Sequence, residues 1–353
     1  MSVDINQLYR PMKKIGWKST AFNVAENLGV IAFFQNLGQY LKEYLFVLAY
    51  HRVDEYENRP WLDPELISAK PAQFNSQMRL VAEKYHPVSA EDVLNAIRGE
   101  QPLPPNAVLV TVDDGYRDFK EEAFPIANQY GIKPVLFIPT AFVGKGPFWW
   151  DKLFAAIANC PASEISTPLG SFFLRNPSEK EQAVIYLRQK VKVLPFDEGM
   201  QIVDVLYNDY APQNKTDTCD ILTWDELRTL ANNGVTIAAH THTHALLSRI
   251  PFERACQEIR TSQEAIRSEI GKVFPIFAFP DGKPEFFTPE LIEFLRGEGF
   301  KFAVTTIDGS ASLSDDRVLC FPRIGLWPNH SLSAFHFHLT PVYRFFRREH
   351  SAY

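Results

Sequence analysis

Seven short, nearly unbroken apolar runs constrain the fold of this 353-residue chain more than any other feature. Each run is four to six residues long, is rich in β-branched or aromatic side chains, and is followed by polar residues. The runs are 45–50, 107–112, 134–138, 235–239, 276–279, 302–305 and 318–321. Runs without polar alternation are typical of strands that are buried on both faces, so they predict a parallel sheet.

Helical patterns separate several of these runs, at 117–130, 224–232, 252–270 and 289–297. Alternating strands and helices indicate an α/β fold, and seven strands favour a closed barrel over an open doubly wound sheet, which remains the alternative. We place this barrel at 45–330. Residues 1–44 show helical spacing and are expected to pack on the barrel, and 331–353 are expected to form a C-terminal helix or tail.

The stretch 144–220 interrupts the strand–helix rhythm after the third run. It contains a tryptophan-bearing segment at 148–153 and a helical pattern over 178–210. We interpret it as a mostly helical insertion that either packs against the barrel or forms a lid over its rim.

Charge and composition limit the kinds of binding partner and cellular location that we expect for this chain. Acidic residues outnumber basic ones by 42 to 36, which argues against a nucleic-acid binder because such a protein needs a concentrated basic face. The N-terminus lacks a secretory signal pattern, and the apolar run 28–34 is too short to span a bilayer, so we expect a cytoplasmic location. The aromatic and basic tail at 343–350 leaves peripheral membrane contact open beside a packed terminal helix. No pattern specifies an oligomeric state.

Acids, histidines and an arginine follow the apolar runs. In parallel α/β folds the C-terminal ends of the strands meet at one rim, where catalytic groups gather. The residues at these positions are His51, Asp113, Asp114, His240, His242, His244, Asp281 and Arg323.

This set predicts a metal site. Two adjacent carboxylates after a buried strand are costly unless a cation stabilises them, although Asp113 and Asp114 could also serve a turn with the following glycine. If the chain turns helical after the fourth run, His240 and His244 share one face, and with a carboxylate they form a three-ligand zinc-type site that leaves one position open. His242 joins them only in an extended chain, so its role stays open.

Two motifs resemble the polysaccharide deacetylase family, also known as NodB-homology or carbohydrate esterase 4 enzymes. Thr-Val-Asp-Asp-Gly at 111–115 is similar to the family's Thr-Phe-Asp-Asp-Gly, and His-Thr-His-Thr-His at 240–244 matches its His-[Ser/Thr]-x-x-His. The segment 222–235 is similar to the segment that precedes the histidine motif in many family members. Tyr-His-Arg-Val at 50–53 is similar to a strand end found in one branch of the family. The resemblance covers roughly 45–143 and 220–326.

The resemblance implies a distorted (β/α)7 barrel and a metal-dependent hydrolase that removes acyl groups from amino sugars. It assigns one divalent cation, zinc in the first place with cobalt, nickel or manganese as alternatives, to Asp114, His240 and His244. It assigns the role of general base to Asp113. Such a cation polarises the amide carbonyl and lowers the pKa of its bound water.

The chain departs from the family pattern at three motifs. The arginine of the third motif is missing at 278–282, so we expect Arg323 to orient the base, with a surface ion pair as the alternative. The backbone N–H of Asp281 is expected to stabilise the oxyanion. The tryptophan-bearing fourth motif and the late Leu-x-His are absent, so we assign the general acid to His51, with His338 second and a structural role for His51 as the alternative.

We therefore predict removal of an N-acetyl group from an amino sugar in a polysaccharide, oligosaccharide or lipid-linked glycan, with carbohydrate as the partner. Two rival hypotheses remain. One is an inactive carbohydrate-binding relative, and the other is a hydrolase of another amide, such as an N-formyl group or a cyclic ureide.

Overall fold

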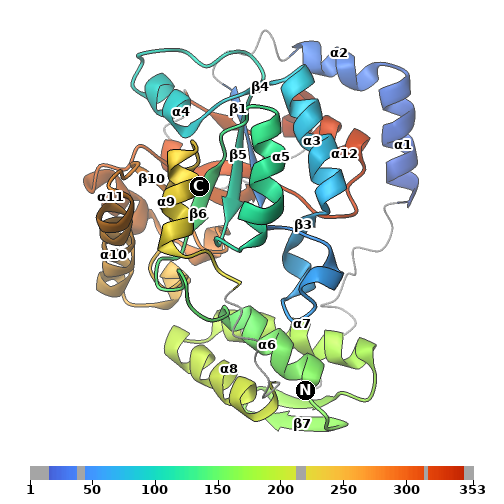
Figure 1. The fold of residues 1–353 in the computed structure, drawn as a ribbon, viewed down its shortest axis with the longest axis vertical. Coiled ribbons are helices and arrows are strands. Elements are labelled where there is room, and N and C mark those ends of the chain that lie inside the picture. The colour runs from blue at the N-terminus through green and yellow to red at the C-terminus, as the bar shows by residue number, and fades with distance from the viewer. Residues whose placement is uncertain (1–15, 38–43, 212–219, 314–316, 346–353) are drawn as a thin grey trace.

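Seven parallel strands close into a barrel in the computed structural model, which describes residues 16–37, 44–211, 220–313 and 317–345 (Figure 1). The strands are β1 (Tyr44–Tyr50), β5 (Ala107–Asp113), β6 (Val135–Ile138), β9 (Thr236–Ala239), β10 (Ile276–Ala278), β11 (Phe302–Asp308) and β13 (Phe321–Gly325). They are hydrogen-bonded in the order β1-β13-β11-β10-β9-β6-β5, and β5 pairs with β1 to close the ring. The predicted (β/α)7 barrel is confirmed.

The unbroken apolar runs follow from burial on both sides of the barrel wall. On β1, Leu45 and Val47 belong to the apolar cluster inside the barrel, whereas Phe46 and Leu48 belong to the cluster between the strands and the outer helices. Successive side chains of a strand point to opposite faces, so a wall that is covered on both sides requires apolar residues at every position.

The last strand lies further along the chain than predicted. The run 318–321 was expected to be a strand, but Val318–Cys320 forms a 3-10 helix (η8), and β13 starts at Phe321. A short apolar run fits a buried helical turn as well as a strand, and periodicity alone does not separate the two. Arg323 therefore lies inside the strand, where its side chain is wholly buried.

Helices cover the outside of the barrel, and short elements link them to the strands. These outer helices are α3 (Pro71–Lys84), the π-helix η5 (Phe119–Ala123) with α5 (Phe124–Gln129), α9 (Trp224–Asn232), α10 (Phe252–Ile270) and α11 (Pro289–Gly297). Helix α4 (Ala90–Ile97) instead packs against the apolar cluster inside the barrel. The short elements are β2 (Arg52–Val53), β3 (Ile67–Ala69), β4 (His86–Pro87), β12 (Ala311–Ser312), η3 (Tyr56–Asn58), η4 (Pro64–Leu66), η6 (Leu247–Arg249) and η7 (Pro284–Phe286). Thr223 and Glu226 form the capping box that starts α9.

The two ends of the chain pack together on the barrel. Helices α1 (Gly16–Asn27) and α2 (Val30–Leu37) contact α12 (Leu332–His338) and α13 (Pro341–Phe345), respectively. The buried imidazole of His336 is hydrogen-bonded to Glu26 and Gln35. Residues 1–15 and 38–43 of the predicted N-terminal helical segment, and 346–353 of the predicted tail, lie outside the described residues.

The insertion forms a separate layer at the lower end of Figure 1. It consists of α6 (Trp149–Asn159), the hairpin β7 (Glu164–Thr167) and β8 (Gly170–Phe173), α7 (Pro177–Val193) and α8 (Phe196–Tyr210). Its helices enclose an apolar cluster of their own, which includes Leu153, Leu187 and Val203. The hairpin is an addition to the mostly helical structure expected from the sequence.

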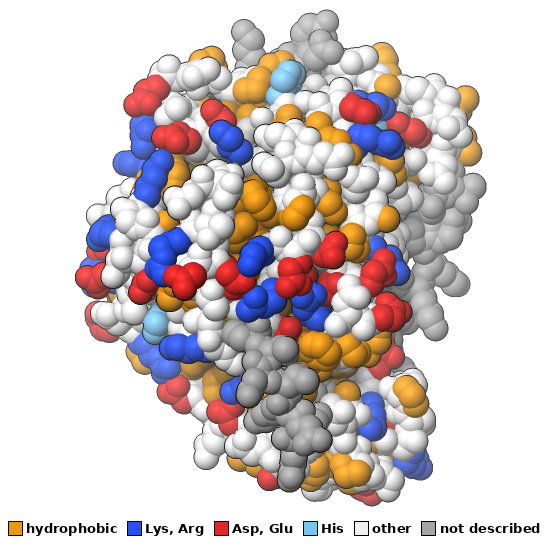
Figure 2. Space-filling model, in the orientation of Figure 1, with side chains coloured by type: hydrophobic (Ala, Val, Ile, Leu, Met, Phe, Trp, Pro, Cys, Tyr) orange, Lys and Arg blue, Asp and Glu red, His pale blue; other side chains and the backbone are white. Residues whose placement is uncertain are grey.

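Surface charge is mixed on the face shown in Figure 2, where basic and acidic side chains intermingle without a large patch of one sign. Among the described residues, no helix has the length and apolar character needed to cross a bilayer.

Candidate active site

The barrel rim and the insertion enclose a pocket of about 450 Å³. Seven residues predicted from the sequence line it: His51, Asp113, Asp114, His240, His244, Asp281 and Arg323. They come from five different strands or the loops directly after them, so the closed barrel brings together residues that are up to 272 positions apart, as between His51 and Arg323.

Asp114, His240 and His244 place three potential metal ligands within 4.8 Å of one another. The Oδ1 atom of Asp114 lies 3.7 Å from Nε2 of His240 and 3.4 Å from Nε2 of His244. Ligand atoms that surround a tetrahedral zinc-type ion at its usual bond lengths stand about 3.3–3.6 Å apart. The observed spacing is therefore close to that of a mononuclear site.

The hydrogen bonds of this group also fit a cation. Oδ1 of Asp114 is buried and has no hydrogen-bond partner among the described residues. Nδ1 of His240 lies 2.8 Å from the carbonyl oxygen of Ala278, which can only accept, so Nδ1 carries the proton and Nε2 presents its lone pair towards Asp114. This is the tautomer that a metal ligand requires.

Burial sets the protonation states of the three groups. Burial, with the charge of Asp113 added, raises the pKa of Asp114 well above its usual 3.8. Burial lowers the pKa of His240 from 6.5 to about 4 and that of His244 well below 6.5. Neutral imidazoles beside a carboxylate that lacks a counter-charge make a donor set that a divalent cation would complete.

The loop that carries the histidines is irregular and forms no helical turn. Thr241 and His244 both adopt positive φ angles, +64° and +57°, and with these two bends in the loop the Nε2 atoms of His240 and His244 both lie close to Oδ1 of Asp114. Glu258 on α10 fixes the loop, because its carboxylate accepts hydrogen bonds from the backbone N–H groups of His242 and Thr243. The imidazole of His242 contacts the hydroxyl of Thr140 and stays outside the candidate ligand group.

Asp113 is held by a buried arginine. Arg323 donates two hydrogen bonds to its carboxylate, of 2.8 and 2.7 Å, and further bonds to Thr111 and to the carbonyl of Thr305. Burial alone would raise the pKa of Asp113, but the charge and hydrogen bonds of Arg323 outweigh it and hold the pKa well below 3.8. The alternative of a surface ion pair for Arg323 is excluded, because its side chain is fully buried.

His51 and Asp281 face the pocket from opposite sides of the rim. Nε2 of His51 lies 4.0 Å from the carboxylate of Asp113, and its side chain is 33% exposed, so it is neither a core residue nor a distant one. Asp281 has a positive φ of +56° in a turn that lies tightly on β11. The next residue must be Gly282, because a Cβ there would stand 2.6 Å from the backbone nitrogen of Thr306.

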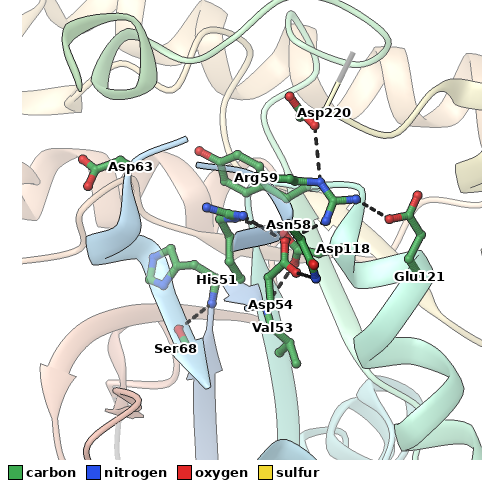
Figure 3. Close-up of polar contacts among 12 residues, drawn as sticks. His51, Val53, Asp54, Asn58, Arg59, Asp63, Ser68, Asp118, Glu121 and Asp220 are labelled. Carbon is green, nitrogen blue, oxygen red and sulfur yellow. Dashed lines mark hydrogen bonds and ion pairs between the residues drawn. The ribbon is translucent and has the colours of Figure 1, made fainter. Parts of the chain in front are cut away.

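A buried ionic network supports the loop that carries His51 (Figure 3). Arg52 bridges Asp54 and Asp118, and Arg59 bonds Asp54 as well. The backbone N–H of His51 itself donates to Ser68 over 2.9 Å. Through Asp118, the network ties the start of this loop to the segment that leads into η5, and it thereby supports the position of the imidazole in the pocket.

The second general-acid candidate lies outside this pocket. His338 is on α12, where its ring contacts His330 and Tyr343, and it does not line the pocket. His51 lines the pocket, and its role as the general acid stays a prediction.

Four pocket residues come from the insertion and were not predicted: Trp149, Trp150, Arg188 and Lys192. Trp150 packs edge-on against His244 at 4.7 Å, and Lys192 bonds Asp281 at 2.5 Å. Trp149 and Trp150 stand out in the sequence, but no local pattern indicates that Arg188 and Lys192 of α7 reach the pocket. A second overlooked group, Trp327, lines the pocket from the segment after β13 and is 40% exposed.

Comparison with known proteins agrees with this geometry. Residues 100–303, more than half of the chain, match the polysaccharide deacetylase family. The chain belongs to the polysaccharide deacetylase family. The matched range contains the metal-ligand group and Asp113 but ends before Arg323, so the arginine contact is a feature of this chain that the match does not cover.

Other deacetylases share the barrel or part of the sequence. The fold is similar to that of the Streptococcus pyogenes deacetylase PplD in complex with acetate (TM-score 0.56, 17% identity, 85% of this chain and 99% of that chain). It is also similar to IcaB from Ammonifex degensii (TM-score 0.52, 18% identity, 84% and 97%). The poly-β-1,6-N-acetyl-D-glucosamine N-deacetylase of Escherichia coli (strain K12) is 32% identical over 84 residues, which are 24% of this chain and only 12% of that protein.

Proposed function

We propose that this family member is a metal-dependent N-deacetylase that removes acetyl groups from amino sugars in a glycan. One observation carries the proposal: the buried, unpartnered oxygen of Asp114 faces two neutral imidazoles, and an arginine-bound carboxylate is its immediate neighbour. The Escherichia coli relative acts on poly-β-1,6-N-acetyl-D-glucosamine, and this supports an N-acetylglucosamine glycan as the substrate class.

Asp114, His240 and His244 would hold the cation. When bound, a divalent ion supplies Lewis-acid chemistry, because it polarises an amide carbonyl and lowers the pKa of water. Asp113 acts as the general base: Arg323 keeps its carboxylate ionised, so it can accept the proton of the attacking water. The pocket has room for one acylated sugar between these groups and the walls of the insertion.

The leaving amine needs a proton, and His51 is placed to donate it. An amine anion is a poor leaving group, so a general acid must protonate the nitrogen as the carbon–nitrogen bond breaks. Nε2 of His51 lies 4.0 Å from the carboxylate of Asp113 and lines the same pocket, which suits a proton delivered close to the point where the base received one. The backbone N–H of Asp281 is the proposed donor to the oxyanion.

Two alternative functions can be distinguished from this one by measuring acetate release. An inactive carbohydrate-binding relative would bind glycans without releasing acetate, and an N-formyl or cyclic ureide hydrolase would act on those amides instead. The intact ligand group and the buried Asp113–Arg323 pair disfavour the inactive relative, because both are costly to retain without a cation or a reaction.

The decisive experiment combines metal analysis with acetate release from N-acetylglucosamine oligomers. Asp114→Ala is expected to lose both bound metal and activity. Asp113→Asn should retain the metal and lose about 10²–10⁴-fold in kcat. His242→Ala is the matched control, because it changes a histidine of the same loop that contacts Thr140 instead, and it should keep both. Full metal content in Asp114→Ala, or full activity in Asp113→Asn, contradicts the proposal.

We further propose a cytoplasmic location with peripheral membrane contact. Support comes from three exposed apolar side chains: Val24 of α1, Leu28 in the turn between α1 and α2, and Phe33 of α2 are 51%, 73% and 61% exposed. Exposed apolar side chains of this kind can enter the headgroup region of a bilayer. Sedimentation with anionic vesicles, compared between wild type and a Leu28→Glu/Phe33→Glu double variant, tests the contact; equal sedimentation of both contradicts it.

A further inference from the structure

The two histidines of the candidate metal site are held in different ways. Nδ1 of His240 is hydrogen-bonded to the carbonyl oxygen of Ala278, whereas Nδ1 of His244 is buried and has no hydrogen-bond partner among the described residues. A histidine that binds a metal usually donates its second ring N–H to a carbonyl or carboxylate, and this bond fixes the orientation of the ring. For His244 the orientation therefore has to come from the groups that pack against its ring.

Aromatic side chains of the insertion supply this packing. Trp150, at the start of α6, meets the imidazole of His244 edge-on with 4.7 Å between the ring centroids. Phe148 stacks on the indole at 4.6 Å and lies 6.2 Å from the imidazole. The ring of His240 also contacts His244, but it belongs to the same loop. Aromatic rings attract each other at such distances and angles, so the insertion supports His244 from outside its own loop.

A buried chain of hydrogen bonds holds Trp150 in place. Its indole Nε1 donates to the hydroxyl of Tyr116 over 2.7 Å, and this hydroxyl lies 2.6 Å from Oδ2 of Asp151. Because an indole N–H can only donate, the hydroxyl accepts from it and donates its own proton to Asp151. Oδ1 of Asp151 in turn accepts the backbone N–H of Asp63 over 2.9 Å. Tyr116 and Asp151 are each 1% exposed, so water does not compete for these bonds.

The chain of hydrogen bonds starts next to another candidate ligand. Tyr116 follows Asp114 by two residues in the turn after β5, and its ring also packs on Phe148 at 5.3 Å. The same tyrosine therefore links the turn that carries Asp114 to the aromatic groups that support His244. The distance of 3.4 Å between Oδ1 of Asp114 and Nε2 of His244 spans the two parts that this tyrosine joins.

We propose that Tyr116, Trp150 and Asp151 are positioning residues, which hold the imidazole of His244 in the orientation that a metal ion requires and so replace the hydrogen bond that this ring lacks. The inference rests on the proposed metal site. It gives the insertion a part in metal affinity as well as in the pocket wall. The metal site is then complete only when the start of α6 is docked on the barrel rim.

Tyr116→Phe tests this role, because it breaks the chain at its centre and keeps the aromatic ring. Loss of a group that orients a metal ligand typically weakens metal binding about 10–100-fold, and we expect zinc affinity to fall within this range. Affinity is measured by competition with a chromophoric chelator, and the visible absorption of the Co²⁺ form reports the ligand geometry. Tyr50→Phe is the matched control, since its hydroxyl is equally buried, bonds Gln77 on α3 and lies outside the pocket lining.

A second substitution tests whether the effect passes through Trp150. Trp150→Ala removes the ring that contacts His244 and should weaken zinc binding at least as much as Tyr116→Phe does. In the Trp150→Ala protein, adding Tyr116→Phe should cause less than about a twofold further loss, because two members of one chain do not act independently. Urea denaturation of the metal-free proteins shows which variants fold. If Tyr116→Phe does not, Trp150→Phe takes its place, since it removes the indole N–H and keeps an aromatic ring.

Wild-type zinc affinity together with an unchanged Co²⁺ spectrum in Tyr116→Phe overturns the positioning role and leaves the metal site standing. Equal losses of affinity in Tyr116→Phe and Tyr50→Phe overturn it as well, because they would reflect stability alone. The same holds for an undiminished effect of Tyr116→Phe in the Trp150→Ala protein. A wild type that binds neither zinc nor cobalt overturns the proposed metal site itself, and this inference with it.

Discussion

The barrel and the insertion contribute to the same pocket in different ways. The barrel supplies side chains from its strands and from the loops directly after them, and strand pairing and burial hold Asp113, Asp114, His240 and Arg323 in place. The insertion supplies tryptophans at the start of α6 and long cations from α7, which reach across to the rim. The comparison teaches that the barrel places the charged groups of the pocket at the ends of its strands, whereas part of the pocket wall comes from a region inserted between two strands.

The ion pairs of the two regions differ in how deeply they are buried. Arg323 and Asp113 of the barrel are 0% and 2% exposed, whereas Lys192 of the insertion and Asp281 are 31% and 10% exposed. Removing one partner of a buried pair costs about 3–5 kcal/mol, because the other charge stays buried. An exposed pair is worth at most about 1 kcal/mol. Substitutions on the barrel side should therefore have the larger effects.

The largest effect is expected for Arg323→Ala. Without the guanidinium, the effect of burial, which raises the pKa of Asp113, is no longer opposed by the charge and hydrogen bonds of Arg323, so the pKa of this carboxyl group should rise. We expect kcat to fall about 10²–10⁴-fold, the range of a lost general base, and stability to fall as well. Arg323→Lys restores the charge but not the two-point contact and should recover part of the activity. Wild-type activity in Arg323→Ala would show that Asp113 does not need this partner.

His51→Ala comes next. Loss of the general acid should slow turnover about 10²-fold while the metal content stays that of wild type. The defect should be smaller for substrates whose leaving group needs no proton, such as an acetylated phenol. His338→Ala is the control, because that histidine lies on α12 outside the pocket, and it should be fully active. A fully active His51→Ala protein would contradict the assignment.

The sequence predicted the barrel side of this comparison much better than the insertion side. The barrel strands and the rim residues were accessible because burial on both faces leaves a continuous apolar run, and polar residues mark its end. The geometry of the histidine loop could not be predicted from the sequence. Its shape depends on positive φ angles at Thr241 and His244, and no sequence pattern marks such angles at residues other than glycine. Lys192 and Arg188 were missed because their contacts depend on how α7 packs across the rim, which local spacing does not encode.

Two buried aspartates extend the comparison to pH. Asp113 of the barrel has an arginine partner, whereas Asp151 of the insertion accepts hydrogen bonds from the hydroxyl of Tyr116 and the backbone N–H of Asp63 and forms no ion pair among the described residues. Burial raises the pKa of Asp151 from 3.8 to about 7, against the opposing effect of these hydrogen bonds. The folded state therefore binds this proton more tightly than the unfolded chain does. The resulting stabilisation is complete below about pH 4 and is lost as the pH rises through about 7.

Urea denaturation of wild type and Asp151→Asn at intervals from pH 4.5 to 7.5 measures this effect. The unfolding free energy of wild type should fall relative to that of the variant as the pH rises, by on the order of a few kcal/mol over the whole range. The contributions of the other groups cancel in the difference. Parallel profiles would show that Asp151 is ionised throughout, as Asp113 is.

The smallest effect is expected for Lys192→Ala, which cuts one link between the insertion and the barrel rim. Asp281 keeps the more distant Lys283, 3.8 Å away, and its turn is still held by Thr306 and by the close approach of Gly282 to β11. Since the Lys192–Asp281 pair is partly exposed, we expect stability to change by less than about 1 kcal/mol and kcat/KM to fall only a few-fold. Lys283→Ala, which removes the more exposed partner of the same carboxylate, should be nearly silent in both measurements. A loss of activity in Lys192→Ala as large as that in Arg323→Ala would mean that α7 takes part in catalysis. The assignment of the reacting groups to the barrel alone would then be wrong.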